Sequence, residues 1–191
     1  MSKNQQAQQP TIYIPLPELT PWSGNYNNGD IGSIAKSIER FGFNGALRVW
    51  QDNIVIGGNH SAMALMSLKA RGPREKQMIG EYAWPPVHII EDGVSGAWLV
   101  PCIDISHLDE LEARAFAIAD NDIARKAVQD AQKKATYLIE LQQQRPEAVD
   151  AASWSADELD EFLSGLSDDI TEDDDCICPV CGAQISGNMK R

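Results

Sequence analysis

The chain has 191 residues, of which 43% are hydrophobic, and its net charge is −12. This size fits one compact domain with tails, and no apolar run approaches the roughly 20 residues that a membrane-spanning helix needs. Ten acidic residues and no lysine or arginine fall within residues 151–175, whereas residues 1–150 hold 18 acidic and 14 basic residues. We therefore expect neither a membrane protein nor a strongly basic groove for nucleic acid, although a local basic patch is not excluded.

The first quarter of the chain predicts a strand and a helix. Residues 1–11 lack the apolar core of a signal peptide, so we expect a flexible tail on a cytoplasmic protein. Alternating apolar residues then predict a strand from Ile12, broken by the prolines that follow. Asp30 and Gly42 are residue types that cap the two ends of a helix, and the apolar residues between them keep helical spacing.

The middle of the chain predicts more strands and a second helix. The segments "ALRVW" and "IVIGG" read as strands joined by a turn, and a helix is expected over residues 60–70. Residues 71–97 have no clear period and predict an ordered insertion. The segments "VHII" and "AWLVPCIDI" flank "EDGVSG", which indicates a hairpin.

The second half of the chain is predicted to be helical. Ser106 and Asp109 have capping-box spacing. The helix after them is expected to pack through the apolar stripe of Leu108, Leu111, Ala115 and Ile118. Residues 122–144 are polar and helix-prone, and a last short helix follows a second capping box formed by Ser155 and Glu158.

Together these patterns predict an α+β fold, with a small mixed sheet and helices followed by a helical C-terminal part and a short cysteine-rich tail. The expected divisions are a flexible tail at 1–11, a domain at 12–130 with an insertion at 71–97, a helical extension at 131–166, an acidic linker at 167–175 and a cysteine-rich segment at 176–191.

The turn "GGNHS" is the first candidate site. Gly57 and Gly58 allow a sharp turn and a close approach to a ligand, and the helix after them would direct its free N–H groups at an anion. Asn59, His60 and Ser61 would add hydrogen bonds to a phosphate. The alternative is an ordinary tight turn with a polar cap. His60 is either an acid–base group or a metal ligand, or else a ring hydrogen-bonded to the backbone.

The cysteines near the C-terminus form the second candidate site. Cys176, Cys178 and Cys181 lie in "DCICPVCG", which is similar to one knuckle of a zinc ribbon. A structural zinc ion takes four ligands, so the fourth would be Cys102, a histidine or a thiolate of a second copy. The last choice would make zinc a link within a homodimer. The alternative is a tail of reduced thiols without metal.

Several segments in this order resemble the ParB/sulfiredoxin-like domain family, in particular the phage- and plasmid-type ParB-like nuclease domain proteins. They are "IPLPELTPWSGNYN", "IGSIAKSIERFGFNGALRVW", "NIVIGGNHSAMAL", "VPCIDISHL" and "EARAFAIADNDIA". The similarity covers roughly residues 12–130, interrupted by 71–97. It implies a ParB-like domain over this range and a nucleotide whose phosphates lie at Gly57 and Gly58.

The resemblance also implies roles for Asp120 and Asn121, which match an acidic–amide step that helps relatives to hold a metal–nucleotide complex. Asp120 would bind Mg²⁺ and act with His60 in catalysis, and Asn121 would contact the metal and the nucleotide. The residues by themselves leave another interpretation open, in which Asp-Asn breaks one helix and caps the next.

Two cationic contacts that are common in the family are absent here. Ser61 stands about where relatives place an arginine, and Asn25-Tyr26-Asn27 replaces an Asn-Pro-Arg-like stretch. A serine hydroxyl does not supply the charge or the forked hydrogen bonds of a guanidinium. Arg48, Lys36 and Arg125 are candidates to replace these contacts.

Two hypotheses follow. In the first, the chain is a DNA-associated ParB-like protein that binds a nucleoside triphosphate with Mg²⁺ and hydrolyses it or a phosphodiester. In the second, it is a catalytically inactive binding or regulatory module, dimerised through its C-terminal part. Because charge stabilises phosphoryl transfer, the missing arginines make weak or absent hydrolysis part of the expectation.

Overall fold

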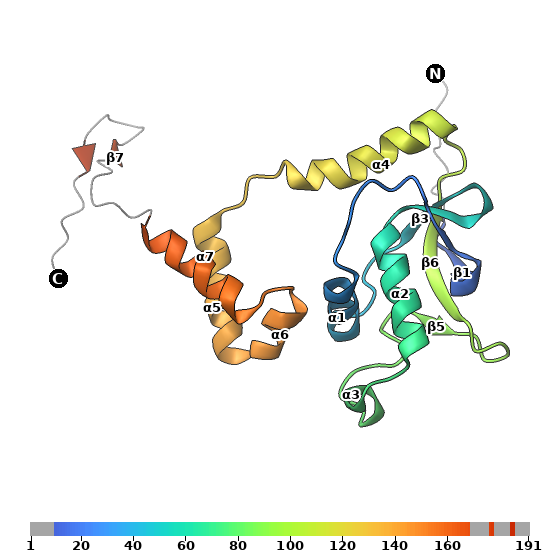
Figure 1. Ribbon diagram of the computed structural model, residues 1–191, viewed down its shortest axis with the longest axis horizontal. Coiled ribbons are helices and arrows are strands. Elements are labelled where there is room, and N and C mark those ends of the chain that lie inside the picture. The colour runs from blue at the N-terminus through green and yellow to red at the C-terminus, as the bar shows by residue number, and fades with distance from the viewer. Residues whose placement is uncertain (1–9, 169–175, 178–183, 186–191) are drawn as a thin grey trace, which may run out of the picture.

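The computed structural model describes residues 10–168, together with residues 176–177 and 184–185. Within these ranges, the body of the protein is a mixed six-stranded sheet packed with helices (Figure 1). Its strands are β1 (Ile12–Pro15), β2 (Thr20–Pro21), β3 (Leu47–Trp50), β4 (Ile54–Gly57), β5 (Ile90–Glu91) and β6 (Trp98–Asp104). The main order is β1-β6-β3-β4-β2, and β5 pairs with β6. The predicted small mixed sheet with helices is confirmed.

The sheet contains both parallel and antiparallel pairs. Strand β3 is parallel to β6 and β2 is parallel to β4, while the remaining pairs are antiparallel. The register of β3 against β4 shifts between Arg48 and Val49, so that Arg48 pairs with Gly57. Such an irregularity changes the direction of a side chain relative to the regular ladder. Here it brings Arg48 beside the end of β4, where the glycine turn begins.

The sheet is buried on both faces. One face packs against α1 (Ile31–Phe41) and α2 (Asn59–Arg71), and the other packs against α4 (Glu110–Arg125). On β4, Val55 belongs to the first core and Ile56 to the second, as expected from the alternation of side chains along a strand. The turn after β4 therefore lies between the two helical layers.

Helix α1 forms where the sequence predicts it. The Asp30 carboxylate accepts the N–H groups of Gly32 at 2.9 Å and of Ser33 at 3.1 Å. Gly42 ends the helix with a φ of 83°, a left-handed value that favours glycine.

The structure of α4 corrects two predictions. Asp109, not Ser106, caps this helix, because its carboxylate accepts the N–H of Glu112 at 2.9 Å. The predicted stripe is not the buried face: Leu111 is 74% exposed and Ile118 is 52% exposed. The helix packs instead through Ala113, Phe116 and Ala117. Small residues let the helix lie close to the sheet, whereas the sequence pattern favoured the larger side chains.

Helix α4 continues through Asp120 and Asn121 and ends at Arg125. The interpretation of Asp-Asn as a helix break is therefore wrong. The break comes later, at residues 126–130, and Asp130 caps the next helix by accepting the N–H of Lys133 at 2.9 Å. The stretch predicted to be helical over 122–144 thus belongs to two helices.

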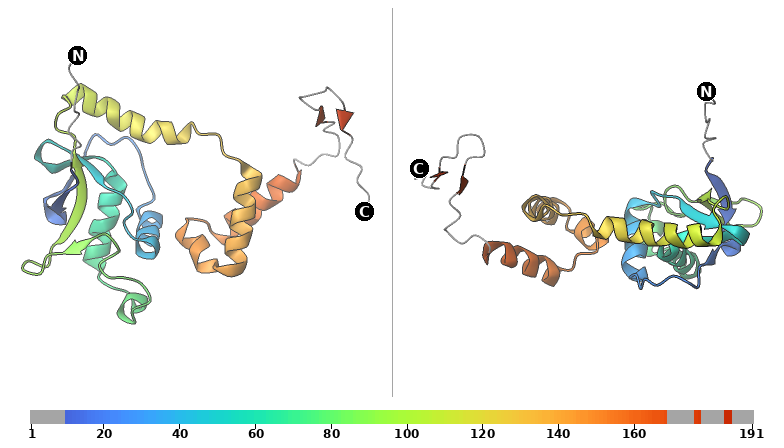
Figure 2. Two further views of the ribbon diagram at one scale, coloured as in Figure 1. Left: turned by 180° about the vertical axis from the view of Figure 1, so that it is seen from behind. Right: turned by 90° about the horizontal axis from the view of Figure 1, so that it is seen from above.

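The C-terminal part of the described chain is a three-helix unit made of α5 (Ala131–Gln144), α6 (Pro146–Ala151) and α7 (Ala156–Asp168). It has a hydrophobic core of its own, centred on Leu138, Val149 and Leu159. The predicted capping box at the start of α7 is confirmed, since Ser155 Oγ accepts the N–H of Glu158 at 3.2 Å. In Figures 1 and 2 this unit lies next to α1 and is joined to α4 by an extended segment.

Residues 71–97 form an ordered excursion that contains α3 (Glu75–Met78). It returns to the core through Ile89 and through Trp84, whose ring meets Trp98 edge-on with centroids 5.0 Å apart. Of the predicted strand "VHII", only Ile90 joins the sheet, and it does so with Glu91.

Near the C-terminus, β7 (Cys176–Ile177) pairs antiparallel with β8 (Gln184–Ile185). The acidic linker, apart from residues 167–168, lies outside the described residues, as do Cys178 and Cys181. Among the helices that the structure describes, none combines the length and apolar character needed to cross a membrane.

Candidate functional site

The site predicted from the sequence begins where β4 ends. Gly58 has a left-handed φ of 82° and is the N-cap of α2. A Cβ atom built on Gly58 would lie 2.8 Å from Leu47 Cδ2, so the position excludes a side chain without rearrangement. Gly57 is enclosed differently: a Cβ atom there would lie 3.2 Å from both Arg48 Cβ and Asp120 Oδ2. The turn therefore needs glycine at Gly58 for its backbone conformation, while a side chain at Gly57 would require Arg48 and Asp120 to shift slightly.

The first turn of α2 presents N–H groups without helical acceptors. Gly58 offers no side-chain cap, and the first backbone bond of the helix is from Ala62 N to Gly58 O at 3.0 Å. The N–H groups of Asn59, His60 and Ser61 precede this bond, so an anion or water has to satisfy them. This is the local arrangement that the sequence predicted for a phosphate.

Asp120 lies at the same turn. Besides its approach to Gly57, its Oδ1 atom lies 3.3 Å from Nη2 of Arg48. Arg48 is held from the other side, since its Nη1 donates to Ala46 O at 2.8 Å. The side chains of Arg48 and Asp120 keep 38% and 28% of their surface exposed, so a ligand can reach both. The structure thus brings together the glycine turn and the carboxylate, which are 63 residues apart in sequence.

Asn121 follows Asp120 on α4. Its Nδ2 atom donates to Ala117 O at 2.8 Å, within the same helix. This bond leaves the Oδ1 atom as the acceptor that a metal or ligand donor would use. Its proposed contact with a metal–nucleotide complex stays a prediction.

His60 fastens the loop at residues 22–29 to α2. Its Nε2 atom accepts the N–H of Gly29 at 3.0 Å and lies 3.3 Å from Asn25 Nδ2 and 3.1 Å from Asn27 O. Three loop groups therefore surround one ring nitrogen. This is the backbone-bonded arrangement considered for His60, and its catalytic role stays a prediction.

The loop also meets the end of α4. Arg125 donates from Nη2 to Asn27 Oδ1, and Tyr26 donates its hydroxyl to Asp122 at 3.3 Å. The loop, the glycine turn and α4 thus frame one region from three sides. Arg48 and Arg125, two of the three cations considered as substitutes for the missing family arginines, both lie here, whereas Lys36 pairs with Asp150 elsewhere.

A recess of about 340 Å³ lies between the loop and the start of α2. Its walls include the indole of Trp22, the side chain of Met63 and several amides. Asn59 is 7% exposed; its Nδ2 donates to Trp22 O at 3.0 Å, and its Oδ1 has no hydrogen-bond partner among the described residues. A buried acceptor without a partner is costly, and Asn59 Oδ1 is enclosed by protein atoms at the wall of the recess. No pattern in the sequence indicates this recess, because its walls come from two segments that are more than 25 residues apart.

The structure bears differently on the two predicted metal sites, the one at Asp120 and the one at the cysteines. Within the described residues, no group of three or more His, Cys, Asp or Glu side chains is placed to hold a metal ion. A metal at Asp120 would therefore depend on ligand atoms, such as phosphate oxygens, as Mg²⁺ commonly does. Cys102 is fully buried in β6, and burial raises the pKa of its thiol to about 12. It is therefore not the fourth ligand of a zinc knuckle, while the knuckle itself lies largely outside the described residues.

Comparison with known proteins supports the architecture. No family model matches the chain, and no curated protein matches it. Among solved structures, the fold is similar to the C-terminally truncated chromosome-partitioning protein ParB from Caulobacter crescentus, a structure complexed with CTP-gamma-S. The match has a TM-score of 0.52 and 13% sequence identity, and it covers 83% of this chain and 79% of that chain. The chain has a ParB-like fold. The ParB-like architecture inferred from the sequence motifs is thereby confirmed at the level of fold.

Proposed function

We propose that this ParB-like chain binds a nucleoside triphosphate with Mg²⁺, with the phosphates at the Gly57-Gly58 turn. The observation that carries the proposal is the approach of Asp120 to Gly57, the residue before the N-cap of α2. Amide donors, a carboxylate for a metal and the guanidinium of Arg48 converge there. These are the groups that a magnesium–phosphate complex uses.

The recess beside the turn fits the nucleoside. Trp22 and Met63 supply apolar surface against which a base or ribose would pack. His60 holds the loop that forms the outer wall, so its role in this proposal is to position that wall. Support for a nucleotide also comes from the similar solved structure, which contains CTP-gamma-S.

The arrangement favours binding over fast hydrolysis. Phosphoryl transfer depends on charge that faces the phosphates, and one of the two arginines near the turn is already paired with Asp120. The His60 ring is engaged by the loop, which leaves Asp120 as the group of the described site that would activate water. We therefore propose that the chain is a nucleotide-binding module. The rate of phosphate release tests the alternative, in which the chain hydrolyses the bound nucleotide.

The test is a titration of CTP, ATP and GTP with Mg²⁺, followed by thermal unfolding. A ligand present at 100 times its dissociation constant adds about 2.7 kcal/mol to the free energy of unfolding. We expect a rise in Tm with at least one nucleotide, and Asp120→Ala and Arg48→Ala are each expected to weaken binding at least about tenfold. Phosphate release is recorded in the same samples.

Arg114→Ala is the matched control, because Arg114 lies on the same helix as Asp120 but pairs with Glu110 within that helix. It is expected to retain the wild-type shift. The absence of a shift with any nucleotide, in a protein whose fold is intact, would refute nucleotide binding. An equal rise in Tm in wild type and in Asp120→Ala would show that the nucleotide does not bind at the proposed turn.

DNA association, dimerisation and zinc binding are further proposals for this chain. We propose that the chain is DNA-associated, and its similarity in fold to a chromosome-partitioning protein supports this proposal. Dimerisation through the C-terminal part and zinc at Cys176, Cys178 and Cys181 stay predictions of the sequence. The metal content of purified protein, compared with a Cys178→Ser variant, tests the zinc site, and the molar mass in solution tests the dimer.

A further inference from the structure

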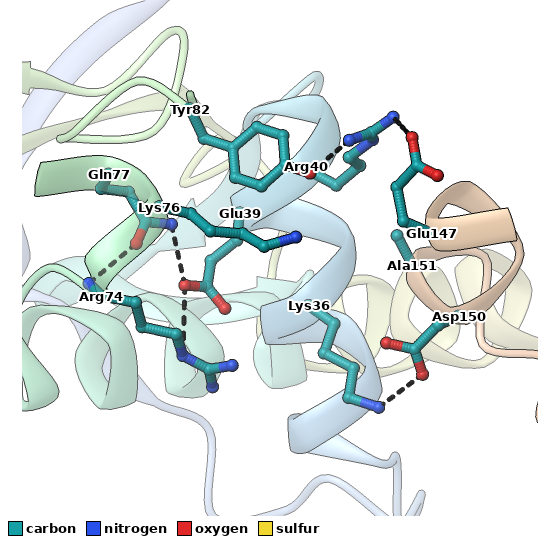
Figure 3. A pocket seen from close by; sticks show the side chains of 10 residues that line it. All are labelled: Lys36, Glu39, Arg40, Arg74, Lys76, Gln77, Tyr82, Glu147, Asp150 and Ala151. Atoms are coloured by element: carbon teal, nitrogen blue, oxygen red, sulfur yellow. Dashed lines mark hydrogen bonds and ion pairs between the residues drawn. The ribbon is translucent and has the colours of Figure 1, made fainter. Parts of the chain in front are cut away.

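A second hollow lies on the other side of α1, away from the glycine turn, with a volume of about 170 Å³ (Figure 3). Its walls come from α1, from α3 and the chain after it, and from α6. Four cationic side chains line it, namely Lys36, Arg40, Arg74 and Lys76. In a chain with a net charge of −12, this is a concentration of positive charge that composition did not reveal.

Glu39 holds the cationic side of this hollow in place. Its carboxyl is 8% exposed and accepts hydrogen bonds from Arg71 and from Gln77, the latter at 3.1 Å. Arg74 Nε lies 3.6 Å from the same oxygen. One buried carboxylate thus ties α3 and the end of α2 to α1. The cations around it are presented by a fixed framework and not by a loose loop.

Besides Glu39, the acidic residues that line the hollow come from α6. Asp150 pairs with Lys36 at 2.7 Å, and Glu147 pairs with Arg40 at 2.9 Å. Arg40 also donates to the Tyr82 hydroxyl, which aims its guanidinium across the hollow. Figure 3 shows both carboxylates reaching from α6 towards α1.

Removing α6 would change the charge of this surface. The residues that line the hollow would then carry four positive charges and one negative charge, that of Glu39. Glu81, which does not line the hollow, lies 3.7 Å from Lys76. Of the two ion pairs between α6 and α1, Lys36–Asp150 is well exposed, with 47% and 64% of its side chains accessible. Exposed ion pairs contribute little to stability and weaken with salt. The three-helix unit also has its own core and does not need α1 to bury it.

We propose that the α1–α3 face, defined by Lys36, Arg40, Arg74 and Lys76, binds the phosphodiester backbone of nucleic acid, and that Glu147 and Asp150 of α6 cover it in the closed form. Two guanidinium forks suit phosphate oxygens, and two ammonium groups add charge. The carboxylates of α6 occupy positions that phosphates would take. This inference deepens the DNA-associated part of the proposed function and rests on it.

The experiment measures binding of a fluorescent 20-base-pair DNA duplex to the full chain at several salt concentrations. The double variant Glu147→Gln/Asp150→Asn removes the cover, and we expect it to bind about tenfold more tightly than wild type at low salt. Its affinity should fall with salt with a slope of about −3 on logarithmic axes, as expected for three to four phosphate contacts. Adding Arg74→Ala and Lys76→Ala should remove the gain and lower the slope by about two.

The matched control is Glu140→Gln/Asp160→Asn. It removes the same charge from the same three-helix unit, at exposed positions that do not line this hollow. If the control binds DNA as tightly as the α6 variant, the gain comes from net charge alone, and the proposal that Glu147 and Asp150 cover the face is refuted. If the gain survives loss of Arg74 and Lys76, the binding face is refuted. Binding of polyglutamate with the same affinity and the same dependence on these residues would overturn nucleic acid as the partner.

Circular dichroism checks the fold of each variant. The single substitution Lys76→Glu, added to Glu147→Gln/Asp150→Asn, repeats the binding test with one change at an exposed position. The nucleotide titration is run on the same set. The variants at Arg74, Lys76, Glu147 and Asp150 should retain the nucleotide shift, because none of these residues lines the recess beside the Gly57-Gly58 turn. Loss of DNA binding with a retained nucleotide shift, or the reverse, therefore separates failure of this proposal from failure of the nucleotide site.

Discussion

At the scale of single residues, the candidate site depends on what surrounds each glycine and each charge. Gly57 gives Asp120 room to approach the backbone, and Gly58 supplies the left-handed conformation that starts α2. Arg48 is brought to the turn by the register shift between β3 and β4. A site of this kind tolerates few substitutions, because each group occupies space that another needs.

The first prediction concerns Gly58→Ala. We expect it to lower the free energy of unfolding by about 1–3 kcal/mol, because alanine is strained at a φ of 82° and its Cβ would press on Leu47. Urea unfolding measures the change. Gly45→Ala is the control, since a Cβ there meets nothing within 4 Å, and it should stay within about 0.5 kcal/mol of wild type. Equal losses in the two variants would contradict the role assigned to Gly58.

The second prediction concerns the Cys102 thiol. Its burial raises its pKa to about 12, so at pH 8 it should react with a thiol reagent more than roughly a thousandfold more slowly than a free cysteine. A chain in which Cys176, Cys178 and Cys181 are serine isolates this thiol. It should label only after unfolding in urea, and rapid labelling of the folded chain would show that Cys102 is accessible.

At the scale of elements, helix ends follow local chemistry. Asp30, Asp109 and Ser155 each cap a helix through bonds to N–H groups within three residues. The hydrogen bonds from the Ser33 hydroxyl and N–H hold the pKa of Asp30 below its ordinary value of 3.8. Because the folded pKa lies below the unfolded one, this cap stabilises above the unfolded pKa and its contribution disappears as pH falls through the folded pKa.

The third prediction uses this pH dependence. In Asp30→Ala, stability should be lower than wild type at pH 7, and the difference should shrink steadily below about pH 4 as the wild-type carboxyl is protonated. Urea midpoints between pH 7 and pH 2.5 measure it. Asp30→Ser is the control, because a hydroxyl caps without titrating, and its stability relative to Asp30→Ala should not vary with pH. A constant gap between wild type and Asp30→Ala would contradict the assignment.

At the scale of the whole molecule, the described chain forms two units whose hydrophobic cores are separate. The sheet and its helices bury one set of apolar side chains, and α5 to α7 bury another. Ion pairs at α6 connect the two units. The chain segment after α4 also joins them (Figure 1). Separate cores joined by polar contacts open independently more easily than a continuous core does.

The fourth prediction follows from the separate cores. Leu138→Ala should destabilise the three-helix unit by about 2–4 kcal/mol and leave the body intact. Hydrogen exchange should then accelerate in residues 131–168 and stay unchanged in α1, α2 and the sheet. Leu65→Ala, which opens a cavity in the main core, is the control and should accelerate exchange in the body. Acceleration throughout the chain in Leu138→Ala would mean that the two units unfold as one.

The sequence by itself determined the elements whose causes are local. The cap at Asp30, the stop at Gly42, the strand before Gly57 and the capping box at Ser155 depend on residues within about four positions, and each was predicted. The same local information placed α4 correctly along the chain but not its buried face. Apolar size favoured Leu111 and Ile118, whereas close packing against the sheet selected Ala113 and Ala117.

Only the tertiary structure decided which distant groups meet. Arg48 and Asp120 lie 72 residues apart, and the cations of α1 meet carboxylates of α6 more than 100 residues away. Such contacts depend on how the sheet orders its strands and how helices pack across it, and no short stretch of sequence carries that information. The glycine turn could therefore be predicted as a candidate site, while its neighbours, the recess beside it and the hollow between α1, α3 and α6 required the fold.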